Sequence, residues 1–180
     1  RQMCIRDRSG STVFRAYEIS TLVKSVNSEI KVVWGGTHPT VMPQDTMQYG
    51  CVDFCVSGWG SKSLLELTIS LLSGTPSIEE IPGLSYRSGD EVKIASTNDT
   101  FEDVHWRDLP YHLIEPTLER YFEIQEERVF PIYTAFGCPY KCTFCMSPIW
   151  YKGVKKKWSP INASDVVDHI QHLKEEYDID

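Results

Sequence analysis

The sequence repeats one plan twice in its first half: an amphipathic segment, a short β-branched run and a glycine-containing turn. Residues 11–26 carry apolar side chains at spacings of three and four, which predicts a helix. A strand is expected at 30–34, a helix at 43–49, a strand at 52–56 and a helix at 64–72. The apolar positions of the first helix are Val13, Ala16, Ile19, Leu22, Val23 and Val26. This alternation predicts an α/β fold with a parallel, doubly wound sheet.

Each of the two strands ends in a turn where the backbone can approach a ligand closely. The first turn is Gly35-Gly36-Thr37-His38-Pro39, and the second is Ser57-Gly58-Trp59-Gly60-Ser61. Ligands of doubly wound sheets bind at the carboxyl ends of the strands, where both turns lie. Ordinary strand-to-helix turns are the alternative interpretation.

The pattern changes after the second helix. Residues 84–87 and 92–94 flank Ser88-Gly89-Asp90, which predicts a β-hairpin, and polar sequence follows as far as Pro110. We expect residues 81–127 to form a hairpin and a connector between two domains. An apolar strand is then expected at 129–136, a cysteine-rich loop after it, a lysine-rich solvated loop at 152–157 and a helix at 163–177. Asn162 or Ser164 would cap this last helix, and its buried face would hold Val166, Val167, Ile170, Leu173 and Tyr177.

Charge and hydropathy exclude several classes of protein. The 180 residues are 41% hydrophobic and 24% charged, which is ordinary for a globular chain, and the net charge of -7 argues against a nucleic-acid partner. No apolar run reaches the roughly 20 residues of a membrane span, and no signal peptide is visible. We therefore expect a soluble, cytoplasmic protein that acts on a small molecule.

Three of the six cysteines lie within eight positions, at Cys138, Cys142 and Cys145. This spacing is too tight for a disulfide framework and places three thiolates on one loop, where they can bind a single metal centre. A structural zinc site or a complete ferredoxin-type cluster would need a fourth ligand. Three ligands leave one iron of a four-iron cluster open, as a catalytic centre requires. A zinc site and a chance spacing remain the alternatives.

The segment Gly137-Cys138-Pro139-Tyr140-Lys141-Cys142-Thr143-Phe144-Cys145, after an apolar strand, resembles the defining motif of the radical S-adenosylmethionine (SAM) superfamily. The resemblance implies that Cys138, Cys142 and Cys145 hold a [4Fe-4S] cluster, that SAM binds its fourth iron, and that Phe144 lies near the adenine. It also implies a reductase, flavodoxin or ferredoxin as electron donor, and a radical made by reductive cleavage of SAM. Residues 128–180 would begin a partial TIM barrel, truncated here, because a single βα unit cannot bury its own faces.

The upstream turns resemble the C-terminal part of the cobalamin-binding domain that precedes the barrel in class B radical SAM enzymes. The resemblance implies a Rossmann-like domain at residues 9–80. The residues that it places along the cobalamin slot are Gly35, Gly36, Thr37, His38, Gly58, Trp59 and Gly60. The family usually has Gly-Glu-Gly-Glu at the second turn, whereas this chain has Gly58-Trp59-Gly60-Ser61.

The other cysteines are interpreted differently. Cys51 and Cys55 flank a predicted strand and are expected to be buried structural thiols rather than ligands. Residues 1–8, with Cys4, resemble translated adapter sequence, and we expect them to be a non-native end.

The sequence thus predicts a fragment of a cobalamin-dependent radical SAM enzyme, inactive by itself, that transfers methyl groups to an unactivated centre. A radical SAM cyclase or rearrangement enzyme of the same architecture and a non-catalytic cobalamin- or metal-binding module are the alternatives.

Overall fold

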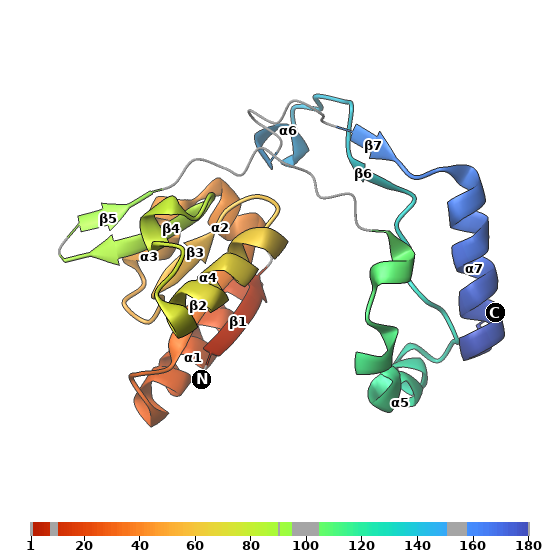
Figure 1. Ribbon diagram of the computed structural model, residues 1–180, viewed down its shortest axis with the longest axis horizontal. Helices are drawn as coiled ribbons and strands as arrows, with labels where there is room; N and C mark the ends of the chain where they lie inside the picture. The colour runs from red at the N-terminus through yellow and green to blue at the C-terminus, as the bar shows by residue number, and fades with distance from the viewer. Residues whose placement is uncertain (1, 8–10, 90, 95–104, 151–157, 180) are drawn as a thin grey trace. The chain divides into compact units, whose positions relative to one another are not determined.

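The computed structural model describes residues 2–7, 11–89, 91–94, 105–150 and 158–179 (Figure 1). The chain divides into two compact units. Unit 1 comprises residues 1–100 and 140–155, and unit 2 comprises residues 101–139 and 156–180.

Unit 1 is built on a sheet with the strand order β1-β2-β3-β4-β5 (Figure 1). Its strands are β1 (Gln2–Asp7), β2 (Lys31–Gly36), β3 (Phe54–Val56), β4 (Leu84–Ser88) and β5 (Glu91–Lys93). The strands β1, β2 and β3 are parallel, and β4 and β5 are antiparallel additions. The α/β architecture and the parallel pairing of the two turn-bearing strands, β2 and β3, are confirmed.

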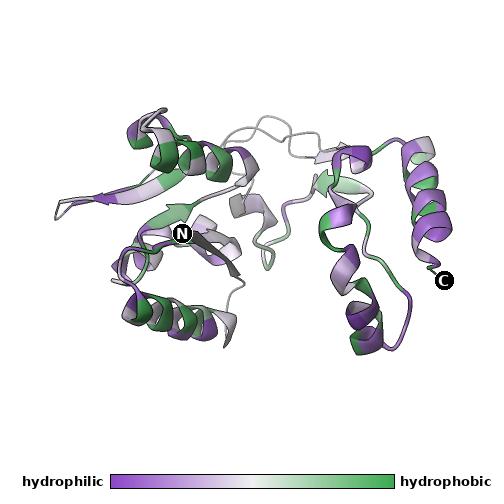
Figure 2. Cartoon of the chain, turned by 60° about the horizontal axis from the view of Figure 1, so that its bottom comes forward, coloured by the Kyte–Doolittle hydropathy of each residue, from purple (hydrophilic) through white to green (hydrophobic). Residues whose placement is uncertain are grey.

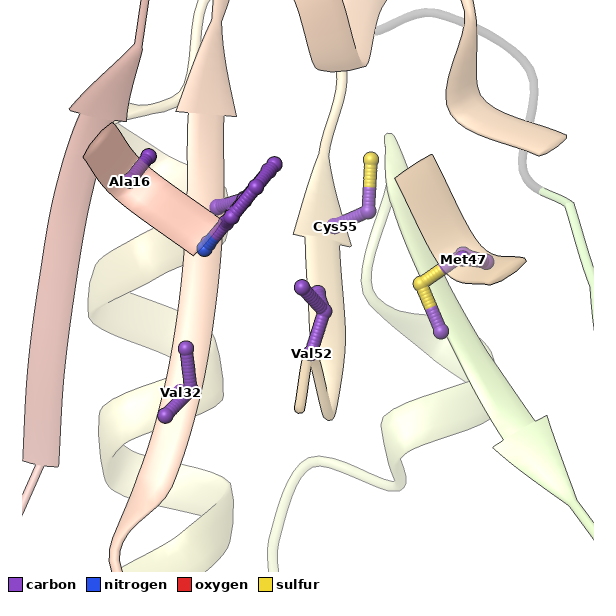
Figure 3. Close-up of a cluster of buried hydrophobic side chains, with 6 residues drawn as sticks. Ala16, Val32, Met47, Val52 and Cys55 are labelled. Atoms are coloured by element: carbon purple, nitrogen blue, oxygen red, sulfur yellow. The ribbon is translucent and has the colours of Figure 1, made fainter. Parts of the chain in front are cut away.

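Helices cover both faces of this sheet. They are α1 (Ser11–Val26), α2 (Thr37–Val41), α3 (Pro43–Gln48) and α4 (Ser61–Ser73). Because successive strand residues point to opposite faces, Val32 and Trp34 pack on one side of β2 and Val33 on the other. The core towards α1 and α3 contains Ala16, Val32, Trp34, Met47, Val52 and Cys55 (Figure 3). The core towards α4 contains Val33, Phe54, Val56, Leu67, Ile81 and Leu84.

The buried stripe of α1 does not follow all of its apolar positions. Three of the apolar positions of the helix are largely exposed: Ile19 is 50%, Leu22 64% and Val26 78% exposed. Ala16 and Ser20 are buried instead, at a spacing of four. Ser20 lies in the core because its hydroxyl accepts a hydrogen bond of 2.9 Å from the indole Nε1 of Trp34. A polar residue therefore occupies the centre of the stripe.

The hairpin expected at 84–94 forms, and it belongs to the sheet of unit 1. β4 pairs with β3, with Leu84 opposite Val56 and Tyr86 opposite Phe54. Arg87 donates hydrogen bonds to the carbonyl oxygens of Met47 and Tyr49 at the end of α3. The hairpin therefore extends the sheet of unit 1, while the assignment of 81–127 as a hairpin and connector and the other domain boundaries stay predictions.

The N-terminal residues take part in the same sheet. Gln2 to Asp7 pair in parallel with Lys31 to Gly36, so this segment supplies an edge strand beside β2. The interpretation of residues 1–8 as non-native sequence stays a prediction.

Over its described residues, unit 2 has two short strands and two longer helices. These are α5 (Glu115–Gln125), β6 (Ala135–Gly137), β7 (Trp158–Pro160) and α7 (Ala163–Tyr177), with 3-10 helices η2 (Trp106–Asp108) and η3 (Tyr111–Leu113). β6 and β7 pair antiparallel, and the strand expected at 129–136 is confined to Ala135–Gly137. The helix α5 was not predicted: its sequence is largely polar, and only Leu118 and Phe122 are buried on it.

The helix α7 forms as predicted and carries hydrophobic and hydrophilic residues along its length (Figure 2). Asn162 caps it by accepting a hydrogen bond of 3.1 Å from the backbone N–H of Ser164. Its buried face was predicted only in part, because Val167 and Ile170 are exposed and His169 is buried with Leu173.

Aromatic rings surround His169 and explain its burial; we call them the ring cluster. Its members are Trp106, Tyr111, Phe130, His169, His172 and Tyr177. The ring of Trp106 stacks on that of His169, with centroids 5.0 Å apart and an interplanar angle of 5°. The hydroxyl of Tyr111 is hydrogen-bonded to Nε2 of His169. Segments before α5 are thereby attached to α7.

We expect unit 2 to lose stability as the pH falls below about 6.5. Burial, together with the charges of His172 and His105, lowers the pKa of His169 from its ordinary value of 6.5. The unfolded chain therefore binds a proton at a higher pH than the folded chain does, and stability is lost progressively as the pH falls from 6.5 to the lowered folded pKa. Urea denaturation of unit 2, followed by hydrogen exchange of peptides from α7 at a series of pH values, measures this loss.

His169→Gln removes the titrating imidazole and should flatten the pH dependence of the free energy of unfolding of unit 2. The matched control is His112→Gln, which replaces an exposed histidine and should leave the profile of the natural sequence unchanged. Oδ1 of Asp165 lies 3.9 Å from Nε2 of His105, so Asp165 is kept in every variant. An unchanged slope in His169→Gln would contradict the assignment.

Candidate cofactor site at the carboxyl edge of the sheet

The two glycine turns lie side by side at the carboxyl ends of β2 and β3, which are neighbouring parallel strands with Gly35 opposite Val56. Gly36 adopts φ 105° and ψ −152°, a region that is essentially restricted to glycine. Gly58 also has a positive φ, of 79°. Side chains at these positions would strain the backbone, which accounts for glycine at both.

Gly60 is required for a different reason. Its φ of −91° is open to any residue, but a Cβ atom there would lie 2.9 Å from Cγ1 of Val56. At Gly35 the nearest atom to such a Cβ is 3.8 Å away, an ordinary contact. The start of α4 therefore approaches β3 too closely for a side chain at Gly60.

Hydrogen bonds connect the two turns directly. The hydroxyl of Thr40 donates to the carbonyl oxygen of Gly36 at 2.6 Å and accepts from the backbone N–H of Gly58 at 2.9 Å. Ser57 Oγ donates to the carbonyl oxygen of Pro39 at 3.2 Å. Thr40 was not among the predicted site residues. Its position in the first turn of α2 after a glycine pair was the available signal, since a threonine in a helix can bond the carbonyl four residues back.

His38 is a predicted site residue with an unsatisfied polar atom. Its Nε2 atom is buried and has no hydrogen-bond partner among the residues that the structure describes. A buried polar atom without a partner is costly, so such an atom indicates a group that binds there. Thr37 and Trp59 are half-buried on the same two turns. The predicted residues of the cobalamin slot are thus gathered at one edge of the sheet.

These residues fit a cofactor with an extended polar tail. Backbone without side chains at Gly36, Gly58 and Gly60 leaves room for close approach, and Nε2 of His38 offers a hydrogen bond. Cobalamin has such a tail, with amide groups around the ring and a nucleotide at its end. The donor set of this edge is therefore compatible with cobalamin.

The cysteine-rich loop begins directly after β6 and ends at β7, with Gly137 paired to Trp158. The backbone N–H of Cys145 donates to the carbonyl oxygen of Cys142 at 3.1 Å, which forms a turn. Ser147 Oγ lies 3.3 Å from Sγ of Cys145, and the N–H of Ser147 donates to that sulfur at 3.4 Å. These hydrogen bonds lower the pKa of the Cys145 thiol and so favour the thiolate that a metal binds.

The cysteines are accessible but are not assembled as a metal site. Cys142 is exposed and Cys138 and Cys145 are half-buried, while Phe144 is 92% exposed. Over the described residues, no group of three or more His, Cys, Asp or Glu side chains is arranged to hold a metal ion. Three thiolates on one loop nevertheless match the donors of an iron–sulfur cluster. Their role as ligands, and that of Phe144 towards SAM, stay predictions.

Within unit 1, the segment that follows the cysteines lies next to the glycine turns. The helix α6 (Ser147–Trp150) has Cα atoms within 8 Å of Cα atoms of α2, the helix that carries His38. The candidate cofactor edge and the end of the cysteine-rich loop are therefore neighbours.

The remaining cysteines and lysines are structural or lie elsewhere. Cys55 is fully buried, and its burial raises the pKa of its thiol to about 12. Cys51 is half-buried against the same core, so the expected burial is confirmed for Cys55 only, and the structural role of both thiols stays a prediction. The lysine-rich loop at 152–157 lies outside the described residues. Among the helices that the structure describes, none combines the length and the hydropathy needed to span a membrane.

Comparison with known proteins supports the interpretation of this edge. The model of the B12 binding domain matches residues 7–68, a range that contains both glycine turns. An uncharacterized methyltransferase of Pyrococcus horikoshii is 28% identical over 170 residues, which cover 94% of this chain and 36% of that protein. The cobalamin-dependent radical SAM methyltransferase TokK of Streptomyces tokunonensis is 28% identical over 136 residues, covering 73% of this chain and 20% of TokK.

Two further relatives bear on fold and function. The anaerobic magnesium-protoporphyrin IX monomethyl ester cyclase of Rubrivivax gelatinosus is 26% identical over 174 residues, covering 93% of this chain and 30% of the cyclase. The radical S-adenosylmethionine methyltransferase TsrM of Kitasatospora setae, solved with cobalamin and a [4Fe-4S] cluster, superposes with a TM-score of 0.67 at 20% identity. That match covers 97% of this chain and 35% of TsrM.

The chain spans between a fifth and about a third of the length of these relatives. Its fold is the C-terminal part of a Rossmann-like cobalamin-binding domain followed by the first βα unit of a radical SAM partial TIM barrel. The chain is thus similar to cobalamin-dependent radical SAM methyltransferases, and its residues 7–68 match the B12 binding domain.

Proposed function

We propose that this chain supplies the cobalamin-binding edge and the cluster loop of a methyltransferase that acts on an unactivated carbon or phosphorus centre of a small molecule. One observation carries the proposal: the two glycine turns are joined by hydrogen bonds at one edge, where Nε2 of His38 is buried without a partner among the described residues. The match to the B12 binding domain spans that edge.

The residues of this chain would bind and orient the cofactors. Gly36, Gly58 and Gly60 keep the edge free of side chains, and His38 offers a hydrogen bond to the cobalamin tail. Cys138, Cys142 and Cys145 would hold a [4Fe-4S] cluster, and Phe144 would contact the adenine of SAM. The cofactors, when bound, supply reductive SAM cleavage and methyl donation, while the protein supplies position and exclusion of water.

A second function is supported by one of the relatives. The cyclase of Rubrivivax gelatinosus shows that proteins similar to this chain include a ring-forming enzyme. A radical SAM enzyme of the same architecture that forms rings or rearranges its substrate is therefore the alternative. Methyl transfer is preferred because both the Pyrococcus horikoshii protein and TokK are described as methyltransferases.

The test uses the longest open reading frame that contains this chain, reconstituted anaerobically with iron and sulfide and loaded with hydroxocobalamin. After reduction, methyl-labelled SAM is added, and both 5'-deoxyadenosine and the label on cobalamin are measured. Label on cobalamin is expected for a methyltransferase. Formation of 5'-deoxyadenosine with no label on cobalamin would favour the rearrangement enzyme, and the absence of both products would contradict both enzymatic functions.

A further inference from the structure

We propose that Thr40 is a positioning residue for cobalamin, whose hydroxyl holds the two glycine turns at a fixed separation. The inference rests on the proposed cobalamin-binding function and assigns a role to a residue outside the predicted slot. Thr40 itself is buried, with 6% of its surface exposed, and acts through the backbone of Gly36 and Gly58.

The directions of the two hydrogen bonds make this hydroxyl specific. A threonine hydroxyl has one proton and two lone pairs. The proton is donated to the carbonyl oxygen of Gly36, so a lone pair remains to accept the N–H of Gly58. One atom therefore fixes the carbonyl that ends β2 and the amide that follows β3. A valine side chain of the same shape could do neither.

Glycine turns need such a connection more than other turns do. Glycine loses more conformational freedom on folding than any other residue, so a slot made of glycines is not held open by its own sterics. Ser57 and Cys55 also contact the first turn, but both donate to the carbonyl oxygen of Pro39, at 3.2 and 3.6 Å. Thr40 is the residue that connects Gly36 with Gly58 directly. A preformed slot binds its ligand more tightly because less ordering is required on binding.

A neighbouring threonine separates this role from ordinary helix packing. Thr46 is also fully buried, and its hydroxyl donates 2.8 Å to the carbonyl oxygen of Met42, four residues back in the sequence. Thr40 makes the same kind of backward bond to Gly36 but adds the bond from the second turn. Thr46→Val thus removes a comparable hydroxyl without touching either glycine turn.

The experiment measures the dissociation constant of hydroxocobalamin for the full 180-residue chain and for the variants Thr40→Val, Thr40→Ser and Thr46→Val. Thermal unfolding and amide hydrogen exchange at Gly58 are measured on the same samples. Thr40→Val is expected to weaken binding roughly tenfold, since the N–H of Gly58 loses its acceptor. Thr40→Ser keeps the hydroxyl and should bind within about threefold of the natural sequence, as should Thr46→Val. Exchange at Gly58 should quicken only in Thr40→Val.

Several outcomes would overturn the proposal. Equal binding by Thr40→Val and Thr46→Val at matched stability would show that the hydroxyl of Thr40 is only structural. If Thr40→Val does not fold, Thr40→Ser and Thr40→Ala decide the question: equal affinity of these two variants contradicts the proposal. If the natural sequence itself binds no hydroxocobalamin while Gly58 exchange still depends on Thr40, the proposed cobalamin function has failed, whereas the connection between the turns stands.

Discussion

Replacing Cys138, Cys142 or Cys145 singly by alanine is expected to abolish the [4Fe-4S] cluster of the anaerobically reconstituted chain. Each proposed ligand is a thiolate, and two thiolates leave a four-iron cluster with two open irons, which are lost to solvent or chelator. The bound iron should fall from about four atoms per chain to nearly none. Iron and sulfide analysis, together with the visible absorbance of the cluster, measures the loss.

The controls are the two cysteines of the sheet core. Cys51→Ala and Cys55→Ala should retain the iron content of the natural sequence, because Cys55 is buried with a pKa of about 12 and neither residue lies on the cysteine-rich loop. Iron retained by all three loop variants, or lost with Cys51 in place of Cys142, would refute the ligand assignment.

Trp34→Ala is expected to destabilise unit 1 by about 3–5 kcal/mol, the typical cost of truncating a buried tryptophan. Trp34 is fully buried in the core between β2, α1 and α3, and its ring contacts that of Tyr49 with centroids 5.4 Å apart. Truncation would leave a cavity and would also remove the hydrogen bond to Ser20, whose hydroxyl is buried. Since β2 ends in Gly35-Gly36, the first glycine turn should lose its order as well.

Hydrogen exchange of peptides from residues 31–56, followed in increasing urea, reports the stability of unit 1 alone. This readout is needed because a chain of two units does not have to unfold in one step. Trp158→Ala, at a half-exposed tryptophan of unit 2, is the control and should leave the exchange of these peptides unchanged. If Trp34→Ala lowers the free energy of unfolding of unit 1 by less than about 1 kcal/mol, this core does not stabilise β2.

The alternation of helices, strands and glycine turns could be predicted because each depends on local periodicity and on glycine. The sequence could not show which face of α1 is buried, since Ser20 replaces an apolar residue at the centre of the stripe. Its burial depends on Nε1 of Trp34, which lies fourteen residues later in the chain. Apolar spacing alone therefore does not locate the buried face, since Ile19 and Leu22 are exposed.

The helix α5 was missed for a similar reason. Its own sequence offers only Leu118 and Phe122 for burial. The guanidinium of Arg128 lies 4.5 Å above the ring of Phe122 and bonds to the carboxylate of Glu119. The same guanidinium donates at 2.8 Å to the carbonyl oxygens of Tyr177 and Asp178, at the end of α7. Contacts between segments that are far apart in the sequence leave no periodic pattern in the sequence of the helix itself.

The candidate site was predictable in its parts and not in its connections. Both glycine turns and His38 could be identified from residue types and from the resemblance to a known family. The position of Thr40 after the glycine pair indicates only its bond to Gly36; the hydrogen bond that it accepts from the N–H of Gly58, in the other turn, leaves no local pattern.

The pairing of β6 with β7 has a consequence for assembly of the cysteine-rich loop. Gly137 and Trp158 are paired across the two strands. The strand pairing, rather than metal binding, therefore offsets the entropic cost of closing the loop between them. Thiols that share such a short tether have an effective concentration in the millimolar range towards one another. Once one thiolate binds an iron ion, the other two thiols would therefore be present to it at a millimolar effective concentration, even where free iron is scarce.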